Sequence, residues 1–471
     1  MKQAMWSKVL PVLALVFASC AGVDDVTSAE GNARGGLTTV TSDFESGSIG
    51  AVQRIADTDW VLSLRDDNDN PDLPDTWRTW WYVRFDDVST AEPTAITVNH
   101  NVWPFLYVPV YSYDGRVWQR FDEQEVTQPE SGTVRVVKRF DAATVWLARF
   151  YPYTRTDLNE YLRRQGDSRY LARRIAGETQ LGYPIELLTI TNPAIDDAMK
   201  RRIWLHARSH PAETGSSFVL EGLIDFLLGD DPDAGTLRSQ FVFSIVPMHN
   251  IDGVVVGNYR TTPESENLES LWLRDPADPW LLTAAVPHEV QVLRDAIAGT
   301  LSAPPAIPVT VALNLHSSNS APDDAAFFIP HFGPASRGYT EDEVRLWTQQ
   351  LALADAVEAF YGAGRIAPRP AEGGRSFVTG NFPESWWWAN RGSDVMAMTL
   401  ETVYGRAGFA PRWVTPADLR ALGRAVALAM LTYHGLPVVN RSAPAERAGV
   451  RVARSLADRY PPGMQVEDGA E

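Results

Sequence analysis

Two periodicities of apolar residues divide the chain. Between about residues 44 and 153, apolar and polar residues alternate in short runs that are rich in aromatic side chains. Turn signals such as Tyr113-Asp114-Gly115 separate these runs. Short alternating strands at this spacing are typical of a β-sandwich, so we predict an all-β domain over residues 42–154. Its predicted strands are 80–85, 95–98, 105–113, 133–139 and 144–151.

From residue 155 onward the period changes, and fully apolar runs alternate with amphipathic helices. The apolar runs predict buried strands, and residues 219–227 and 416–433 carry helical spacing. Thr156 is the expected cap of the first helix, and Thr415 that of the last. This alternation predicts an α/β domain with a mixed, mostly parallel sheet over residues 155–440. Its predicted buried strands are 203–207, 241–246, 309–315 and 395–400.

The two ends of the chain differ in composition from the two predicted domains. Lys2 and Lys8 precede a short apolar run, and small residues then lead to Cys20, the only cysteine. This resembles a bacterial lipoprotein signal, with residues 1–19 as the signal peptide, lipidation at Cys20 and a polar tether over residues 20–41. We therefore expect an exported protein on a membrane surface, with the outer membrane favoured; an ordinary secretory signal is the alternative. Residues 441–471 are charged and are predicted to be a loose tail.

The overall charge narrows the range of partners. The formal net charge is −17, and the sequence has no basic stripe that would neutralise phosphates. We therefore exclude nucleic acid as a partner. The acidic stretch 66–75 lacks the glycine and terminal glutamate of a calcium-binding loop, so a solvated loop is the favoured interpretation.

Four polar residues stand at the ends of predicted strands. His210 and Glu213 follow strand 203–207, His316 follows strand 309–315, and Glu401 follows strand 395–400. Ligands of open α/β sheets bind at the carboxyl ends of the strands, so these side chains are expected to meet. Two imidazoles and one carboxylate form a typical catalytic zinc set, which leaves Glu401 free to act as a base.

These residues also carry a family resemblance. The segment ARSHPAET, residues 207–214, resembles the zinc motif of the zinc carboxypeptidases, in the branch of the cytosolic carboxypeptidases. The segment IVPMHNIDGVVVGNYR, residues 245–260, resembles a second block of that branch, and LNLHSS and TLET stand where the family has its third ligand and its catalytic glutamate. The resemblance covers roughly residues 42–436 and includes the β-sandwich.

The resemblance implies a role for each matched residue. His210, Glu213 and His316 would hold one zinc ion per chain, and Glu401 would be general base and then general acid. Arg260 would stabilise the oxyanion of a peptide or amide substrate. The implied activity is that of a zinc metallopeptidase that hydrolyses peptide-type amide bonds.

One segment departs from the family pattern. Glu269 and Ser270 occupy the positions at which the branch has the Asn and Arg that clamp the terminal carboxylate of the substrate. A carboxylate next to Glu269 would be repelled, and Arg274, Arg375, Arg391 or Arg406 are the candidate substitutes for substrate binding. Smaller departures include Asn314 for the Asp two residues before the third ligand. The alternatives that stay open are an amidohydrolase that acts away from a free carboxyl end and a catalytically weak binding lipoprotein. The oligomeric state is left open.

Overall fold

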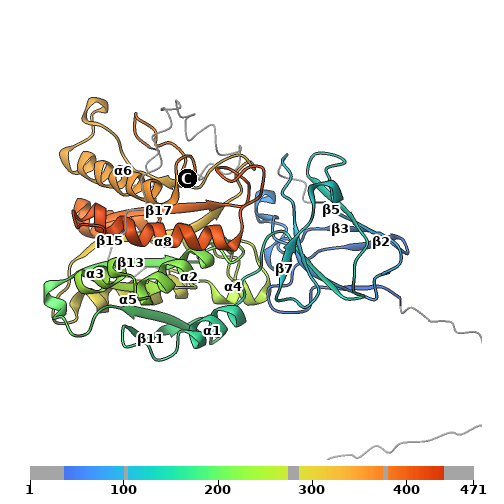
Figure 1. Cartoon of the computed structure of the whole chain (residues 1–471), viewed down its shortest axis with the longest axis horizontal. Coiled ribbons are helices and arrows are strands. Elements are labelled where there is room, and N and C mark those ends of the chain that lie inside the picture. Colours follow the sequence, from blue (N-terminus) through green and yellow to red (C-terminus); the bar gives the residue numbers. More distant parts are fainter. Residues whose placement is uncertain (1–36, 100–103, 274–285, 375–379, 440–471) are drawn as a thin grey trace, which may run out of the picture. The chain divides into compact units, whose positions relative to one another are not determined.

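The two periodicities correspond to two kinds of sheet. The computed structural model describes residues 37–99, 104–273, 286–374 and 380–439 (Figure 1). The described residues from Thr38 onward belong to one compact unit. The predicted signal peptide, the lipidation site Cys20 and the predicted tail 441–471 lie outside the described residues.

The first part is all-β, as predicted. Each of two sheets has five strands among the described residues, and Trp60, Phe85, Ile96 and Leu147 are buried between them. The predicted strand 105–113 is reduced to three residues. In sheet order, the strands are β1 (Thr39–Thr41), β4 (Tyr82–Asp86), β10 (Val145–Ala148), β6 (Val110–Ser112) and β7 (Trp118–Arg120), and β2 (Val52–Ala56), β3 (Asp59–Ser63), β5 (Thr94–Asn99), β9 (Thr133–Lys138) and β8 (Val126–Thr127).

The second part is built on a mixed sheet with seven strands in the described part of the chain. Its four central strands are parallel to one another, and antiparallel strands flank them on both sides. This confirms the predicted fold class. The order is β11 (Leu171–Glu178), β12 (Pro184–Ile190), β14 (Phe241–Val246), β13 (Arg201–Ala207), β15 (Val309–Ser318), β17 (Met396–Val403) and β16 (Phe327–Ile329).

Helices cover this sheet. Helix α8 packs against α2, α3 and α6, and α2 and α6 also contact the central strands (Figure 1). The approach of α2 to α8 is close, because a Cβ at Gly222 would lie 2.0 Å from the carbonyl oxygen of Arg420. The helices are α1 (Arg155–Arg164), α2 (Gly215–Leu228), α3 (Pro232–Gln240), α4 (Ile251–Val256), α5 (His288–Ser302), α6 (Glu341–Tyr361), α7 (Pro383–Arg391) and α8 (Pro416–Tyr433).

Two local predictions are wrong in detail. Helix α1 is capped by Thr154 rather than Thr156, since Thr154 and Asp157 form a reciprocal capping box. Strands β15 and β17 do not stop before their functional residues but continue to Ser318 and Val403, because the two strands pair over the full stretch. His316 and Glu401 therefore lie within strands and not after them.

No helix among residues 37–439, as far as they are described, has the length and apolarity that crossing a membrane requires.

Trp386 and Trp387 of α7 are almost fully buried and pack against each other. Both rings therefore belong to the hydrophobic core.

Candidate metal centre

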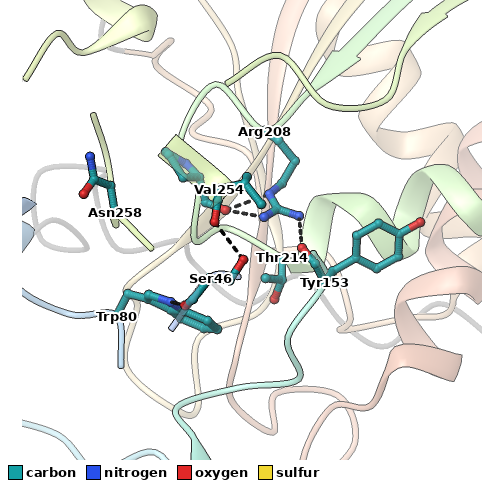
Figure 2. A pocket seen from close by; sticks show the side chains of 8 residues that line it. Ser46, Trp80, Tyr153, Arg208, Thr214, Val254 and Asn258 are labelled. Carbon is teal, nitrogen blue, oxygen red and sulfur yellow. Dashed lines mark hydrogen bonds between the residues drawn. The ribbon is translucent and has the colours of Figure 1, made fainter. Parts of the chain in front are cut away.

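The loop between β13 and α2 carries two of the predicted ligands. It is held by Arg208, which has a φ of 64° and a fully buried side chain. Its guanidinium donates to the carbonyl oxygen of Pro211 (2.9 Å), to that of Tyr153 (3.0 Å) and to Ser217 Oγ (2.8 Å). Figure 2 shows this guanidinium between the loop and Tyr153. A buried arginine that satisfies several carbonyl groups fixes the backbone that presents His210.

The three predicted ligands converge. Glu213 Oε1 lies 2.8 Å from His210 Nδ1, and Glu213 Oε2 lies 2.8 Å from His316 Nδ1. The two Nδ1 atoms are 3.1 Å apart, and all three side chains are buried. One ligand atom from each residue falls within 4.8 Å of the others.

The far side of each imidazole has a partner. His210 Nε2 lies 3.1 Å from Asn267 Oδ1, and His316 Nε2 lies 3.0 Å from Glu269 Oε2. Since an amide or carboxylate oxygen accepts, these contacts assign a proton to each Nε2 and direct Nδ1 toward Glu213. The second oxygen of Glu269 accepts from Asn314 Nδ2 at 2.7 Å. Metal-binding histidines are commonly oriented in this way.

The donor set fits zinc. Zinc binds imidazole nitrogen at about 2.0–2.1 Å, so two nitrogens in a tetrahedral site lie about 3.3 Å apart. The separation of the Nδ1 atoms, 3.1 Å, is close to that value. Two imidazoles and a carboxylate are also the ligands that catalytic zinc prefers.

The electrostatics of the site favour a cation. Burial opposes the charge of His316, but the carboxylates of Glu269 and Glu213 outweigh it and raise its pKa well above the ordinary value. Burial likewise opposes the charge of Glu213, while His210 and His316 lower its pKa. Burial and the positive charge of Arg260 lower the pKa of His210. A positive charge between these carboxylates is therefore strongly stabilised.

Glu401 lies beside the predicted ligands. It is the register partner of His316 in the parallel pair of β15 and β17, so both side chains point to the same face. Its Oε2 atom is buried and has no hydrogen-bond partner among the described residues. Burial and the negative charge of Glu213 raise the pKa of Glu401 to about 8. A free carboxylate oxygen of raised basicity suits proton transfer.

Arg260 follows α4 and faces the same site. Its charge lowers the pKa of both His210 and Glu401, which places the guanidinium within electrostatic range of them. The guanidinium carbon lies 5.1 Å from the centre of the Trp77 ring. Its Nε is buried without a hydrogen-bond partner in the described part of the chain.

The predicted substrate-binding arginines do not join this group in the described structure. Arg406 pairs with Asp323 at 2.8 Å and lies 3.7 Å from Glu123. Arg391 donates to the carbonyl oxygen of its neighbour Asn390. Arg274 and Arg375 lie outside the described residues.

The sequence predicts that Glu269 repels a carboxylate of the substrate, but in the structure this side chain has other partners. The residue is 7% exposed, and its two carboxylate oxygens are occupied by His316 and by Asn314. Asn267 was not singled out from the sequence, although it stands at the start of the segment that departs from the family pattern. The family has Asp and Asn at the two positions that Asn314 and Glu269 occupy in this chain. The carboxylate and the amide have thus exchanged places, which indicates that the two residues are partners.

Comparisons with known proteins agree with these features. Residues 40–150 match the family model described as the cytosolic carboxypeptidase N-terminal domain, and residues 162–276 match the model described as zinc carboxypeptidase. Cytosolic carboxypeptidase 6 of Mus musculus is 32% identical over 268 residues, which cover 53% of this chain and 48% of that protein. Cytosolic carboxypeptidase 3 of Mus musculus is 31% identical over 254 residues, 48% of this chain and 25% of that protein. The matches therefore span between a quarter and a half of these relatives.

Solved structures share the fold. A metallo-carboxypeptidase from Burkholderia cenocepacia superposes with a TM-score of 0.69 at 24% identity, covering 85% of this chain and 99% of that chain. A putative carboxypeptidase from Burkholderia mallei gives a TM-score of 0.70 at 24% identity, with 85% and 97% covered. The chain is thus similar to the N-terminal domain of the cytosolic carboxypeptidases over residues 40–150 and, next along the chain, to the zinc carboxypeptidases over residues 162–276.

Proposed function

We propose that the protein is a zinc-dependent hydrolase of peptide-type amide bonds, with Glu401 as the proton-transfer group and Arg260 as the oxyanion stabiliser. One observation carries this proposal: a buried His-Glu-His set has a carboxylate with a free oxygen as the direct strand neighbour of its third member. A site that only bound a metal would not require that second carboxylate.

The residues divide the chemistry among them. His210, Glu213 and His316 would hold the zinc ion, which would supply a Lewis acid for the carbonyl and lower the pKa of an attacking water. Glu401 accepts the proton of the attacking water at Oε2 and then donates it to the leaving nitrogen. A cation held by these three side chains would offset the charge of Glu213 and so lower the pKa of Glu401 from its raised value.

Arg260 supports the same step through charge. Its guanidinium is held near the metal-binding residues, and its Nε has no partner among the described residues to compete for it. A fixed cation that faces the developing oxyanion stabilises the transition state more than the ground state. Removal of one such donor costs about 10²–10³-fold in rate in comparable sites.

We propose that the residues at positions 269 and 270 do not select the substrate. Glu269 is occupied by His316 and Asn314, and Ser270 carries no charge. Among the described residues, positions 269 and 270 therefore offer a terminal carboxylate no cationic partner at the place where the family binds it. This favours, as a second candidate, hydrolysis of an amide bond that is not adjacent to a free carboxyl end.

Membrane attachment is a separate part of the proposal. It rests on the sequence around Cys20 and on the polar stretch 20–41, which resemble a lipoprotein signal and its tether. Mass spectrometry of the protein from its native membrane fraction tests it, since a diacylated Cys20 at the mature N-terminus is expected. An unmodified mature N-terminus, or cleavage elsewhere, would rule the anchor out.

The activity is tested with purified protein and a peptide library. One zinc ion per chain is expected, and Glu401→Gln should lower hydrolysis by ~10²–10⁴-fold while it retains zinc. Glu92→Gln is the matched control, because Glu92 is exposed in the β-sandwich. Sub-stoichiometric zinc or full activity of Glu401→Gln would contradict the enzymatic proposal. Comparison of free and amidated carboxyl ends then separates the two candidates.

A further inference from the structure

The acidic stretch 66–75 is solvated only in part, because five of its residues are exposed but Asp67 is buried. It reaches from the β-sandwich to the segment 258–265, which carries Arg260. Asp67 is 5% exposed, and burial raises the pKa of its carboxyl group although several donors oppose this shift. The interpretation from sequence, a hydrated acidic loop, is therefore wrong for this residue.

The carboxylate of Asp67 binds three consecutive backbone amides. Oδ1 accepts from the N–H of Tyr259 at 2.6 Å, and Oδ2 accepts from the N–H groups of Arg260 and Thr261, both at 2.8 Å. Oδ2 also accepts from Thr261 Oγ1 at 3.0 Å. One carboxylate that holds three successive N–H groups fixes the φ and ψ angles of the residue between them.

Asn68 and Trp77 make further contacts with the segment 258–265. Asn258 Nδ2 donates to Asn68 Oδ1 at 2.8 Å, and Asn68 Nδ2 donates to the carbonyl oxygen of Thr262 at 2.8 Å. Asn68 adopts a left-handed φ of 57°, a conformation that this residue type tolerates better than most. Two residues beyond the stretch, the ring of Trp77 lies under the guanidinium of Arg260.

We propose that Asp67 and Trp77 of the β-sandwich are positioning residues for Arg260, so that the N-terminal domain completes the catalytic site. Asp67 fixes the backbone of Arg260, and Trp77 fixes the direction of its guanidinium through a cation–π contact. The inference rests on the proposed role of Arg260. Electrostatic stabilisation depends on placement, and a shift of about 1 Å can cost ~100-fold in rate.

A purely structural role makes a different prediction. If Asp67 only joined the two domains, its loss would lower stability and would affect activity independently of Arg260. If it acts through Arg260, its loss should change kcat more than KM, and only while Arg260 is present. A double-mutant cycle separates the two cases.

The first measurement does not depend on activity. Hydrogen exchange of the amides of Tyr259, Arg260 and Thr261 is followed in full-length Asp67→Asn, with Asp72→Asn as control because Asp72 is exposed in the same loop. We expect exchange about 10–100-fold faster in Asp67→Asn alone, the effect of losing a charge-assisted hydrogen bond. Unchanged exchange in a folded Asp67→Asn protein overturns the proposal.

The second measurement is the cycle of Asp67→Asn with Arg260→Ala. We expect kcat to fall by about 10–100-fold in Asp67→Asn and no further loss when Arg260 is already Ala. An undiminished effect of Asp67→Asn in that background overturns the proposal. Should Asp67→Asn not fold, Trp77→Leu takes its place in the same cycle. A wild type without hydrolytic activity refutes the proposed function, while the exchange measurement still decides whether Asp67 holds the segment.

Discussion

Replacement of Glu269 by Gln tests the metal centre most directly. The carboxylate accepts from His316 Nε2 at 3.0 Å and from Asn314 Nδ2 at 2.7 Å. Gln keeps the shape but has only one acceptor oxygen for these two donors. Either the imidazole or the Asn314 amide therefore loses its acceptor, and the charge that polarises His316 disappears as well.

The magnitude follows from the role of such partners. Loss of an acceptor behind a metal-binding histidine typically weakens metal affinity by about 10–100-fold. This corresponds to about 1.4–2.7 kcal/mol of binding free energy. We expect the zinc Kd of Glu269→Gln to rise by this factor, while kcat of the zinc-saturated variant changes less.

The assay is a zinc competition titration against a chromogenic chelator near neutral pH. Glu264→Gln, an exposed glutamate of the same segment, is the control. The double variant Glu269→Gln/Asn314→Asp should recover most of the affinity, because it restores a carboxylate–amide pair with the charge on the other partner. A zinc Kd within twofold of wild type, or a double variant no better than the single one, would refute this reasoning.

Two further predictions concern stability. Gly222→Ala should lower the free energy of unfolding by about 3 kcal/mol, because its Cβ would lie 2.0 Å from a backbone carbonyl of α8. Gly235→Ala is the control in the same urea titration: its Cβ would have nothing within 4 Å, so it should be neutral or slightly stabilising. Burial and the charge of Glu269 raise the pKa of Glu384 from 4.5 to about 7, so the folded chain retains a proton that the unfolded chain has lost between these pH values. Wild-type stability should fall through this window, and Glu384→Gln should gain up to roughly 3 kcal/mol relative to wild type between pH 4.5 and pH 8. A stability difference that is the same at both pH values would show that this carboxyl does not titrate as described.

The sequence was sufficient to predict the site wherever the place of a residue followed from its position along a strand. The fold class was predictable because the period of apolar residues changes once, near residue 155. The convergence of His210, Glu213, His316 and Glu401 was predictable because carboxyl ends of parallel strands meet at one edge. The exact ends of β15 and β17 were not, since strand length depends on how far the neighbour continues to pair.

The sequence was insufficient where a residue's role depends on the direction of its side chain. The charge of Glu269 was evident, but its contact with His316, 47 positions away, was not. Asp67 lies in a stretch whose composition is typical of a solvated loop, and its backbone partners are 192 to 194 positions away. The missed cap at Thr154 did have a local signal, since Thr154 and Asp157 stand at capping-box spacing.

His316 and Glu401 pair on neighbouring strands, so their spacing is kept even when the segments that connect the strands change in evolution. Their spacing is set by the hydrogen-bond ladder of neighbouring strands, about 4.8 Å, and no loop can alter it without breaking the sheet. Arg260, the proposed oxyanion stabiliser, and Glu269, which contacts His316, lie on segments that connect the strands instead. Changes can therefore accumulate in these segments while the spacing of the two strand positions stays the same, which makes this sheet a suitable scaffold for redesign of the surroundings of the site.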